Sequence, residues 1–118
     1  MKSISLENYI IKIGQNAHDN WDMLDQAKPS DIFFHLSSFP SCYVILEYTQ
    51  NEDSSPIIDH VYDPHMLNTC AKLCKENTKY KLLSNIKVSY CKISNVYKGD
   101  VPGEVVYKSN RQVKYLTV

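Results

Sequence analysis

The chain has 118 residues, 43% of them hydrophobic, which is enough for one domain with one core and too few for two. Thirteen basic and thirteen acidic residues give a formal net charge of zero, which excludes a highly charged disordered chain and an overall basic one. No apolar stretch approaches the ~20 residues that span a bilayer, and the first residues lack the apolar core of a secretory signal. We therefore predict a single domain over residues 1–118 in an intracellular, cytoplasmic protein with no membrane association.

The charges are divided unevenly along the chain. Residues 1–59 carry three basic and nine acidic residues, a balance of −6, whereas residues 60–118 carry ten basic and four acidic residues, a balance of +6. The second half is therefore the half that could meet phosphate groups. Mutual neutralisation of the two halves across the folded surface explains the same numbers equally well.

The first predicted element is a strand over residues 9–13, which are apolar and rich in Ile and end at Gly14, where the chain can turn sharply. A one-sided helix is expected from residue 17 to residue 27, ended by the proline that follows. The next two segments, 31–36 and 42–49, carry Ile, Phe, Tyr and Val, and the short gap between them favours an antiparallel hairpin.

In that hairpin, the rings of His35 and Tyr43 would touch if the two residues lie opposite each other. The residues that follow, 50–56, are polar and acidic without periodicity, and an exposed loop is expected there.

A second helix is predicted from Asp63, as N-cap, and Pro64, as first helical residue, to about Asn77. One face is apolar and should be buried, with Met66, Leu67, Cys70, Ala71, Leu73 and Cys74. The other face is a polar, mostly basic stripe with Asn68, Lys72, Lys75 and Lys79. Three further strands are expected at 86–91, 104–107 and 113–117, with a Pro102-Gly103 turn before the second of them. The fold class is therefore α+β, with about two helices packed on a mixed or antiparallel sheet.

Two residue groups suggest chemistry. Asp31 and His35 share one face of a strand, as an acid–base pair would, but two pleats separate them by about 13 Å, too far for direct contact. His35 is better explained by a hydrogen bond to buried backbone or by contact with a nucleotide, so we predict no catalytic residues. Cys70 and Cys74 are four apart on the second helix, with His60 and His65 nearby, but a Cys-x-x-Cys signature is missing. We predict no metal, no cofactor and no disulfide bond among the four cysteines.

Basic and aromatic residues alternate in the second half of the chain. They are Lys87, Lys92, Lys98, Lys108, Arg111 and Lys114, interleaved with Tyr90, Tyr97, Tyr107 and Tyr115. Lys and Arg neutralise phosphates while Tyr rings stack on unpaired bases, although any half-buried strand with a wet face shows the same alternation. The turn from Gly14 to Ala17 could likewise hold one phosphate oxygen, or Gly14 could serve only to turn the chain.

Several short motifs occur in a fixed order. They are Gly14-Gln15-Asn16-Ala17 with Asn20, Asp31-Ile32-Phe33-Phe34-His35, Pro40-Ser41-Cys42-Tyr43, and Asn95-Val96-Tyr97-Lys98 followed by Pro102-Gly103. In order and spacing, from about Tyr9 to Val118, they resemble the RNA-binding domain of the NFACT family, above all its small stand-alone members. Ser41, Cys42 and Tyr43 stand where the family has Gly, Ser and His, which puts a role needing two imidazoles in doubt. Tyr43 keeps an aromatic ring and a hydroxyl that could stack on a base or donate to a phosphate.

The resemblance implies a non-catalytic RNA-binding domain that contacts rRNA or tRNA in translation or ribosome-associated quality control. We expect a basic platform from the C-terminal strands and the second helix to hold the RNA backbone. The candidate RNA-binding residues are Asn16, Asn20, His35, Tyr43, Lys72, Lys75, Lys92, Tyr97, Lys98, Lys108 and Arg111. The alternatives are a protein-interaction domain that docks on a ribosome-associated or other assembly through its acidic half, a general DNA- and RNA-binding protein, and, third, an enzyme acting on RNA or a nucleotide. The oligomeric state stays open.

Overall fold

A computed structural model describes residues 1–6, 8–37, 39, 41–49 and 64–118. Within these residues the main sheet has six strands in the order β1-β2-β4-β3-β5-β8, and each strand runs antiparallel to its neighbours. Their bounds are β1 (Lys2–Ser5), β2 (Tyr9–Ile13), β3 (Ile32–Leu36), β4 (Val44–Tyr48), β5 (Lys87–Lys92) and β8 (Lys114–Thr117). The predicted α+β class with an antiparallel sheet is confirmed.

Two helices and a small hairpin complete the described structure. The helices are α1 (Ala17–Gln26) and α2 (Pro64–Glu76), and the hairpin pairs β6 (Val96–Lys98) with β7 (Val105–Tyr107). Single 3₁₀ turns, η1 (Ile93–Asn95) and η2 (Asn110–Gln112), lead into β6 and β8. No helix in the described part of the chain is long and apolar enough to cross a bilayer.

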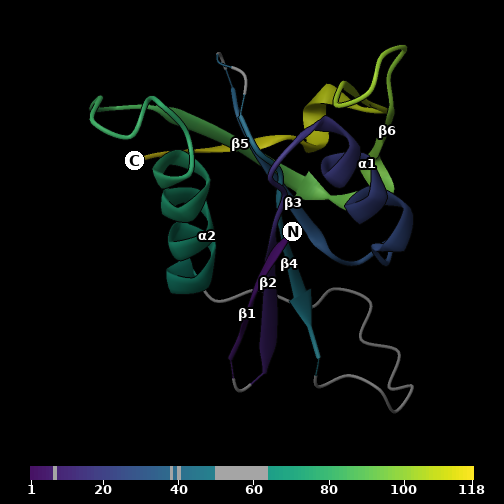
Figure 1. The fold of residues 1–118 in the computed structure, drawn as a ribbon, viewed down its shortest axis with the longest axis horizontal. Helices are drawn as coiled ribbons and strands as arrows, with labels where there is room; N and C mark the ends of the chain where they lie inside the picture. The colour runs from purple at the N-terminus through teal and green to yellow at the C-terminus, as the bar shows by residue number, and fades with distance from the viewer. Residues whose placement is uncertain (7, 38, 40, 50–63) are drawn as a thin grey trace.

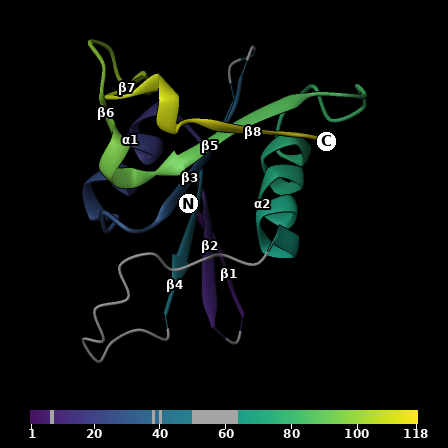
Figure 2. The same ribbon diagram turned by 180° about the vertical axis from the view of Figure 1, so that it is seen from behind.

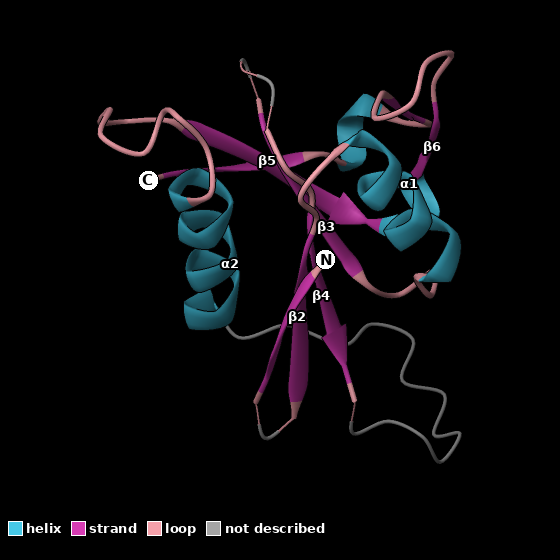
Figure 3. Ribbon diagram, viewed as in Figure 1, coloured by secondary structure: helices cyan, strands magenta, loops and turns pink. Residues whose placement is uncertain are grey.

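The two helices pack on opposite faces of the sheet (Figures 1 and 3). Alternate residues of the central strands point to opposite faces. Phe34 and Val44 pack with Cys70 and the rest of the apolar side of α2. Phe33 and Ile45, their chain neighbours, pack instead with Met23 of α1, and the β6–β7 hairpin closes over this second cluster. The central strands are therefore buried on both faces, which explains the uninterrupted apolar runs at 32–34 in β3 and 44–46 in β4.

The structure confirms the predicted elements and adds two strands. In the β3–β4 hairpin Phe34 pairs with Val44, so His35 lies opposite Tyr43, and their ring centroids are 5.6 Å apart in an edge contact, as predicted. Missing from the prediction were β1, whose side chains are all exposed, and β6, which has only three residues. The expected exposed loop 50–56, the N-cap Asp63 and His60 lie outside the described residues.

Candidate nucleic-acid interface

An open cleft of about 800 Å³ lies where four turns from distant parts of the sequence meet. The turns are the β2–α1 turn, the β3–β4 connection, the turn after α2 and the Pro102-Gly103 turn. Residues lining the cleft are Gly14, Gln15, Asn16, Ala17, Asn20, His35, Ser41, Cys42, Asn77, Thr78, Lys79, Tyr80, Pro102 and Gly103. The cleft therefore brings together three of the predicted RNA-binding residues, Asn16, Asn20 and His35. Most of its other lining groups are amides, hydroxyls or backbone.

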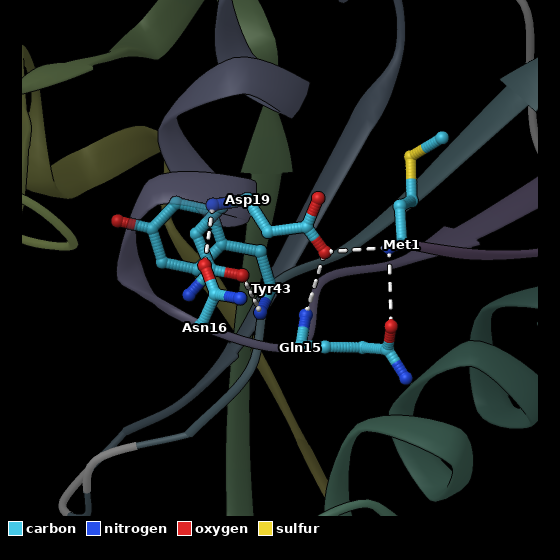
Figure 4. A network of polar contacts seen from close by, with 6 residues as sticks. Met1, Gln15, Asn16, Asp19 and Tyr43 are labelled. Carbon is cyan, nitrogen blue, oxygen red and sulfur yellow. Dashed lines mark hydrogen bonds and ion pairs between the residues drawn. The ribbon is translucent and has the colours of Figure 1, made fainter.

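Asn16 forms the first part of this wall by capping α1. Its Oδ1 accepts a hydrogen bond from the backbone N–H of Asp19 at 2.8 Å. Asp19 in turn accepts from the Gln15 N–H at 2.9 Å and pairs with the terminal ammonium of Met1 at 2.8 Å (Figure 4). The bond from that ammonium holds the pKa of Asp19 below its usual range. The backbone N–H of Gln15, which the sequence suggested as a donor to a phosphate, therefore already donates to the carboxylate of Asp19.

Asn20 joins α1 to the sheet. It is buried, and its Oδ1 accepts from the backbone N–H of Tyr43 at 3.3 Å. Gly14 donates its N–H to the Tyr43 carbonyl at 2.9 Å and lies so close that a Cβ there would come within 1.9 Å of Asn20 Oδ1. Asn20 therefore needs a glycine beside it, which gives Gly14 a packing role in addition to turning the chain.

His35 and Tyr43 form the next part of the wall. The half-buried ring of His35 stacks on Phe33, with centroids 6.2 Å apart, and burial lowers the pKa of His35, which favours the neutral imidazole at pH 7. Tyr43 is fully buried, its hydroxyl donates to the carbonyl of Gly103, and burial raises its pKa. The expectation that Tyr43 stacks on a base is therefore wrong, because its ring belongs to the core and its hydroxyl holds the Pro102-Gly103 turn.

Asp31 takes no part in the cleft. It is buried at the opposite end of β3 from His35, where its Oδ2 accepts from the backbone N–H of Lys28 at 2.9 Å. Desolvation raises the pKa of this carboxyl group. The carboxylate therefore stabilises the turn before β3 and does not orient the imidazole of His35.

The predicted basic residues do not form one platform. Lys72 and Lys75 belong to α2, on one face of the sheet, and the Lys75 Nζ donates to the Val118 carbonyl at 3.3 Å. Lys98 belongs to the hairpin on the other face, pairs with Asp25 of α1 at 2.8 Å and lies over a tryptophan ring. The sheet therefore lies between Lys98 and the two lysines of α2, so Lys98 does not share a surface with them.

Of the remaining candidates, Tyr97 belongs to the hairpin and Lys108 and Arg111 follow it in the chain, whereas Lys92 lies opposite Ile32, which packs on the α2 side of the sheet. Lys92, Lys108 and Arg111 are exposed, and Tyr97 is 49% exposed. None of them lines the cleft. Among the described lining residues the lysine is Lys79, in the turn after α2, with its Nζ 5.5 Å from the Tyr80 ring centroid.

The sequence analysis placed Lys79 only in the helical stripe, included Gln15 only through its backbone in the Gly14–Ala17 turn, and missed Asn77 and Thr78 altogether. The polar run Asn77-Thr78-Lys79 directly after a helix was the available signal. The described residues that line the cleft include Lys79 and His35 but no Asp or Glu, and the Asp19 carboxylate at its edge already accepts the Gln15 N–H. The cleft is thus suited to an anionic or hydrogen-bonding ligand. Among the residues with described positions, no three His, Cys, Asp or Glu side chains converge to hold a metal ion.

Comparison with known proteins agrees with the motif pattern. The family model of the NFACT protein RNA-binding domain matches residues 2–112. The chain is 30% identical over 120 residues to coiled-coil domain-containing protein 25 of Mus musculus, covering 98% of this chain and 55% of that protein. It is 27% identical over 111 residues to the homologue in Dictyostelium discoideum, covering 92% and 52%. The chain thus spans about half the length of these relatives.

A solved structure shares the fold. It is the C-terminal part of the fibronectin/fibrinogen-binding protein of Streptococcus suis, with a TM-score of 0.74 over 93% of this chain and 40% of that one. Identity is 21%, so this likeness bears on the fold alone.

Proposed function

Because the chain belongs to the NFACT RNA-binding domain family, we propose that it is a non-catalytic RNA-binding domain whose cleft beside α1 holds the RNA backbone. The proposed setting is the cytoplasm, with rRNA or tRNA as ligand in translation or ribosome-associated quality control. A ribosome-associated protein is a further proposed partner.

The composition of the cleft wall carries this proposal. Its polar side chains are the amides of Gln15, Asn16, Asn20 and Asn77, hydroxyls, one imidazole and one ammonium, with no carboxylate among the described lining residues. Amides, hydroxyls and Lys are the groups that proteins use to contact phosphate and sugar. Amide groups can also donate to and accept from a ribose 2′-hydroxyl, the group that distinguishes RNA from DNA.

Lys79 is the cation best placed for the phosphate. It lines the cleft, whereas Lys98 is paired with Asp25 of α1 and does not line the cleft. We therefore assign the main phosphate contact to Lys79 and supporting roles to Lys108 and Arg111, which are exposed outside the cleft.

The test is titration of fluorescent structured RNA, single-stranded RNA and duplex DNA with the purified chain at two salt concentrations. Bound phosphates release counterions, so affinity should fall steeply with salt. Lys79→Gln should weaken RNA binding and reduce the slope of log affinity against log salt by about 0.7, the contribution of one phosphate on a single strand. Lys72→Gln is the matched control, an exposed lysine on α2 outside the cleft. Equal effects of the two variants, or no binding of RNA, would overturn the proposal.

Docking on a protein is the second candidate, and α1 favours it. Its Asp22 and Asp25 are both exposed, on the half of the chain with the acidic balance. If the chain binds no RNA at low salt, or binds it without salt dependence, this acidic helix becomes the better candidate interface.

A further inference from the structure

We propose that a second hollow, next to the cleft, binds one unpaired nucleobase, with Tyr115 as the stacking surface. The inference rests on the proposed function, because it names the form of RNA that the domain takes. The hollow lies on the face of the sheet that α2 does not cover.

Three residues form a row across this face. His35 of β3 pairs directly with Ser89 of β5, and Ser89 pairs directly with Tyr115 of β8. Directly opposite residues of neighbouring strands project from the same face of a sheet. Their face is that of Phe33, which packs with α1 and the hairpin, and therefore faces away from α2. Figure 2 shows β5 and β8 in the foreground, between α1 on one side and α2 on the other.

Helix α1 and the hairpin cover only part of the face. Phe33 and Tyr43 are fully buried beneath them, whereas Tyr115 at the edge of the sheet is 54% exposed. His35 lies at the boundary between the covered and the exposed part. An aromatic ring exposed on an open sheet is the arrangement on which single-stranded RNA bases stack.

A hollow of about 370 Å³ lies on the exposed part. Its lining includes His35, Ser37, Ser89, Tyr107, Asn110 and Tyr115. The Ser89 hydroxyl donates to the His35 carbonyl at 3.0 Å and lies 3.2 Å from the Tyr107 hydroxyl. These two contacts fix the position of the Ser89 side chain at the base of the hollow. The hollow can therefore offer a ring face together with hydroxyl and amide groups to a flat polar ligand.

The charges distinguish this hollow from the cleft. Glu104 lines the hollow, whereas the described lining of the cleft has no carboxylate. A carboxylate repels a phosphate but accepts hydrogen bonds from the amino groups of bases. The cleft is therefore suited to the backbone and the hollow to a base.

Two further features connect the hollow to an RNA strand. His35 and Gly103 line both the cleft and the hollow, so the two sites are adjacent. Lys87 places its Nζ 5.9 Å from the Tyr115 ring centroid, where it can neutralise a phosphate beside a stacked base. A strand with its backbone in the cleft can thus place a neighbouring base on Tyr115, provided that the base is unpaired, because paired bases lie inside a duplex.

The experiment compares four probes: a short oligoadenylate, an abasic ribose-phosphate strand of equal length, duplex RNA and single-stranded DNA. Wild-type chain should prefer oligoadenylate to the abasic strand and to duplex RNA. Tyr115→Ala should weaken oligoadenylate binding about tenfold and abolish that preference, since stacking on one aromatic ring contributes about this much. Tyr115→Phe, which keeps the ring, should bind like wild type. Tyr97→Ala is the matched control, because Tyr97 is comparably exposed on the hairpin outside the hollow.

The outcomes separate the two proposals. If wild type binds RNA and Lys79→Gln weakens it, but Tyr115→Ala behaves like Tyr97→Ala, the base site is refuted and the cleft stands. If the abasic strand binds wild type as tightly as oligoadenylate does, the base site is refuted as well. If no probe binds at low salt, both proposals fail. Equal binding of the DNA strand would retain the base site and show that the 2′-hydroxyl is not read.

Discussion

Substituting Gly14 by Ala should destabilise the fold through one specific contact. An alanine Cβ at this position would lie 1.9 Å from the Oδ1 of Asn20 and 3.0 Å from the Sδ of Met23. The φ angle of Gly14 lies outside the left-handed region, so the backbone itself tolerates a side chain. Without the contact, replacing Gly by Ala would stabilise a chain by about 0.4–1 kcal/mol through the entropy of the unfolded state.

The cost follows from what must move. Asn20 has to withdraw, which breaks its 3.3 Å bond from the Tyr43 N–H and leaves that buried group without its acceptor. Losing such a partner costs about 1–3 kcal/mol, and extra atoms in a packed core cost about 1–3 kcal/mol more. We expect Gly14→Ala to lower the free energy of unfolding by about 2–4 kcal/mol, a large part of the 5–15 kcal/mol typical of a domain.

Urea unfolding followed by circular dichroism measures this loss. Gly99→Ala is the matched control: the nearest atoms to its Cβ belong to the exposed side chain of Glu104, which can swing away into solvent at the cost of its exposed bond from the Asp100 N–H. Its cost should stay below about 1 kcal/mol. In an Asn20→Ala background the added cost of Gly14→Ala should shrink, because its clashing partner is gone. A Gly14→Ala variant as stable as wild type, or strictly additive costs in the double variant, would refute the reasoning.

Three further measurements address the wall of the cleft. Tyr43→Phe removes the hydroxyl that holds the Gly103 carbonyl, and should cost about 1 kcal/mol in urea unfolding and weaken RNA binding; unchanged values for both would contradict this role. Burial lowers the pKa of His35 from its usual 6.5, so the unfolded chain takes up the proton more readily and stability should fall as pH drops below about 6.5. This decline in stability should be smaller in His35→Gln. If the stability of the variant and of wild type, measured by urea unfolding, depends on pH in the same way, His35 does not cause the decline. Cys42 is half-buried and its contact with Cys74 lowers its pKa, so iodoacetamide should modify it before the other cysteines, as mass spectrometry would show; earlier modification of another cysteine would exclude this order.

Local patterns in the sequence were enough to predict most elements. Residues 9–13 were predicted as a strand and form β2 with the same bounds. Pro64 was placed as the first residue of the second helix, where α2 begins. These predictions succeed because burial repeats every two residues in a strand and every 3.6 in a helix, and proline restricts the local backbone. In contrast, β1 is an edge strand with every side chain exposed, so no hydrophobic alternation identifies it.

The site was only partly predictable. Motif order alone identified Asn16, Asn20 and His35, which the cleft brings together. The sequence could not show that Tyr43 is buried, because a tyrosine opposite a histidine in a hairpin can lie either in the core or on the surface.

The sequence by itself determined the local elements, the ordered motifs and the charge difference between the two halves of the chain. The tertiary structure decided which turns meet, and therefore that Lys79 joins the cleft while Lys72 and Lys98 lie on opposite faces of the sheet. It also placed His35, Ser89 and Tyr115 in one row. The physical reason is that periodicity records which side of an element is buried, whereas meetings between distant segments depend on the strand order β1-β2-β4-β3-β5-β8, which only the packed core selects.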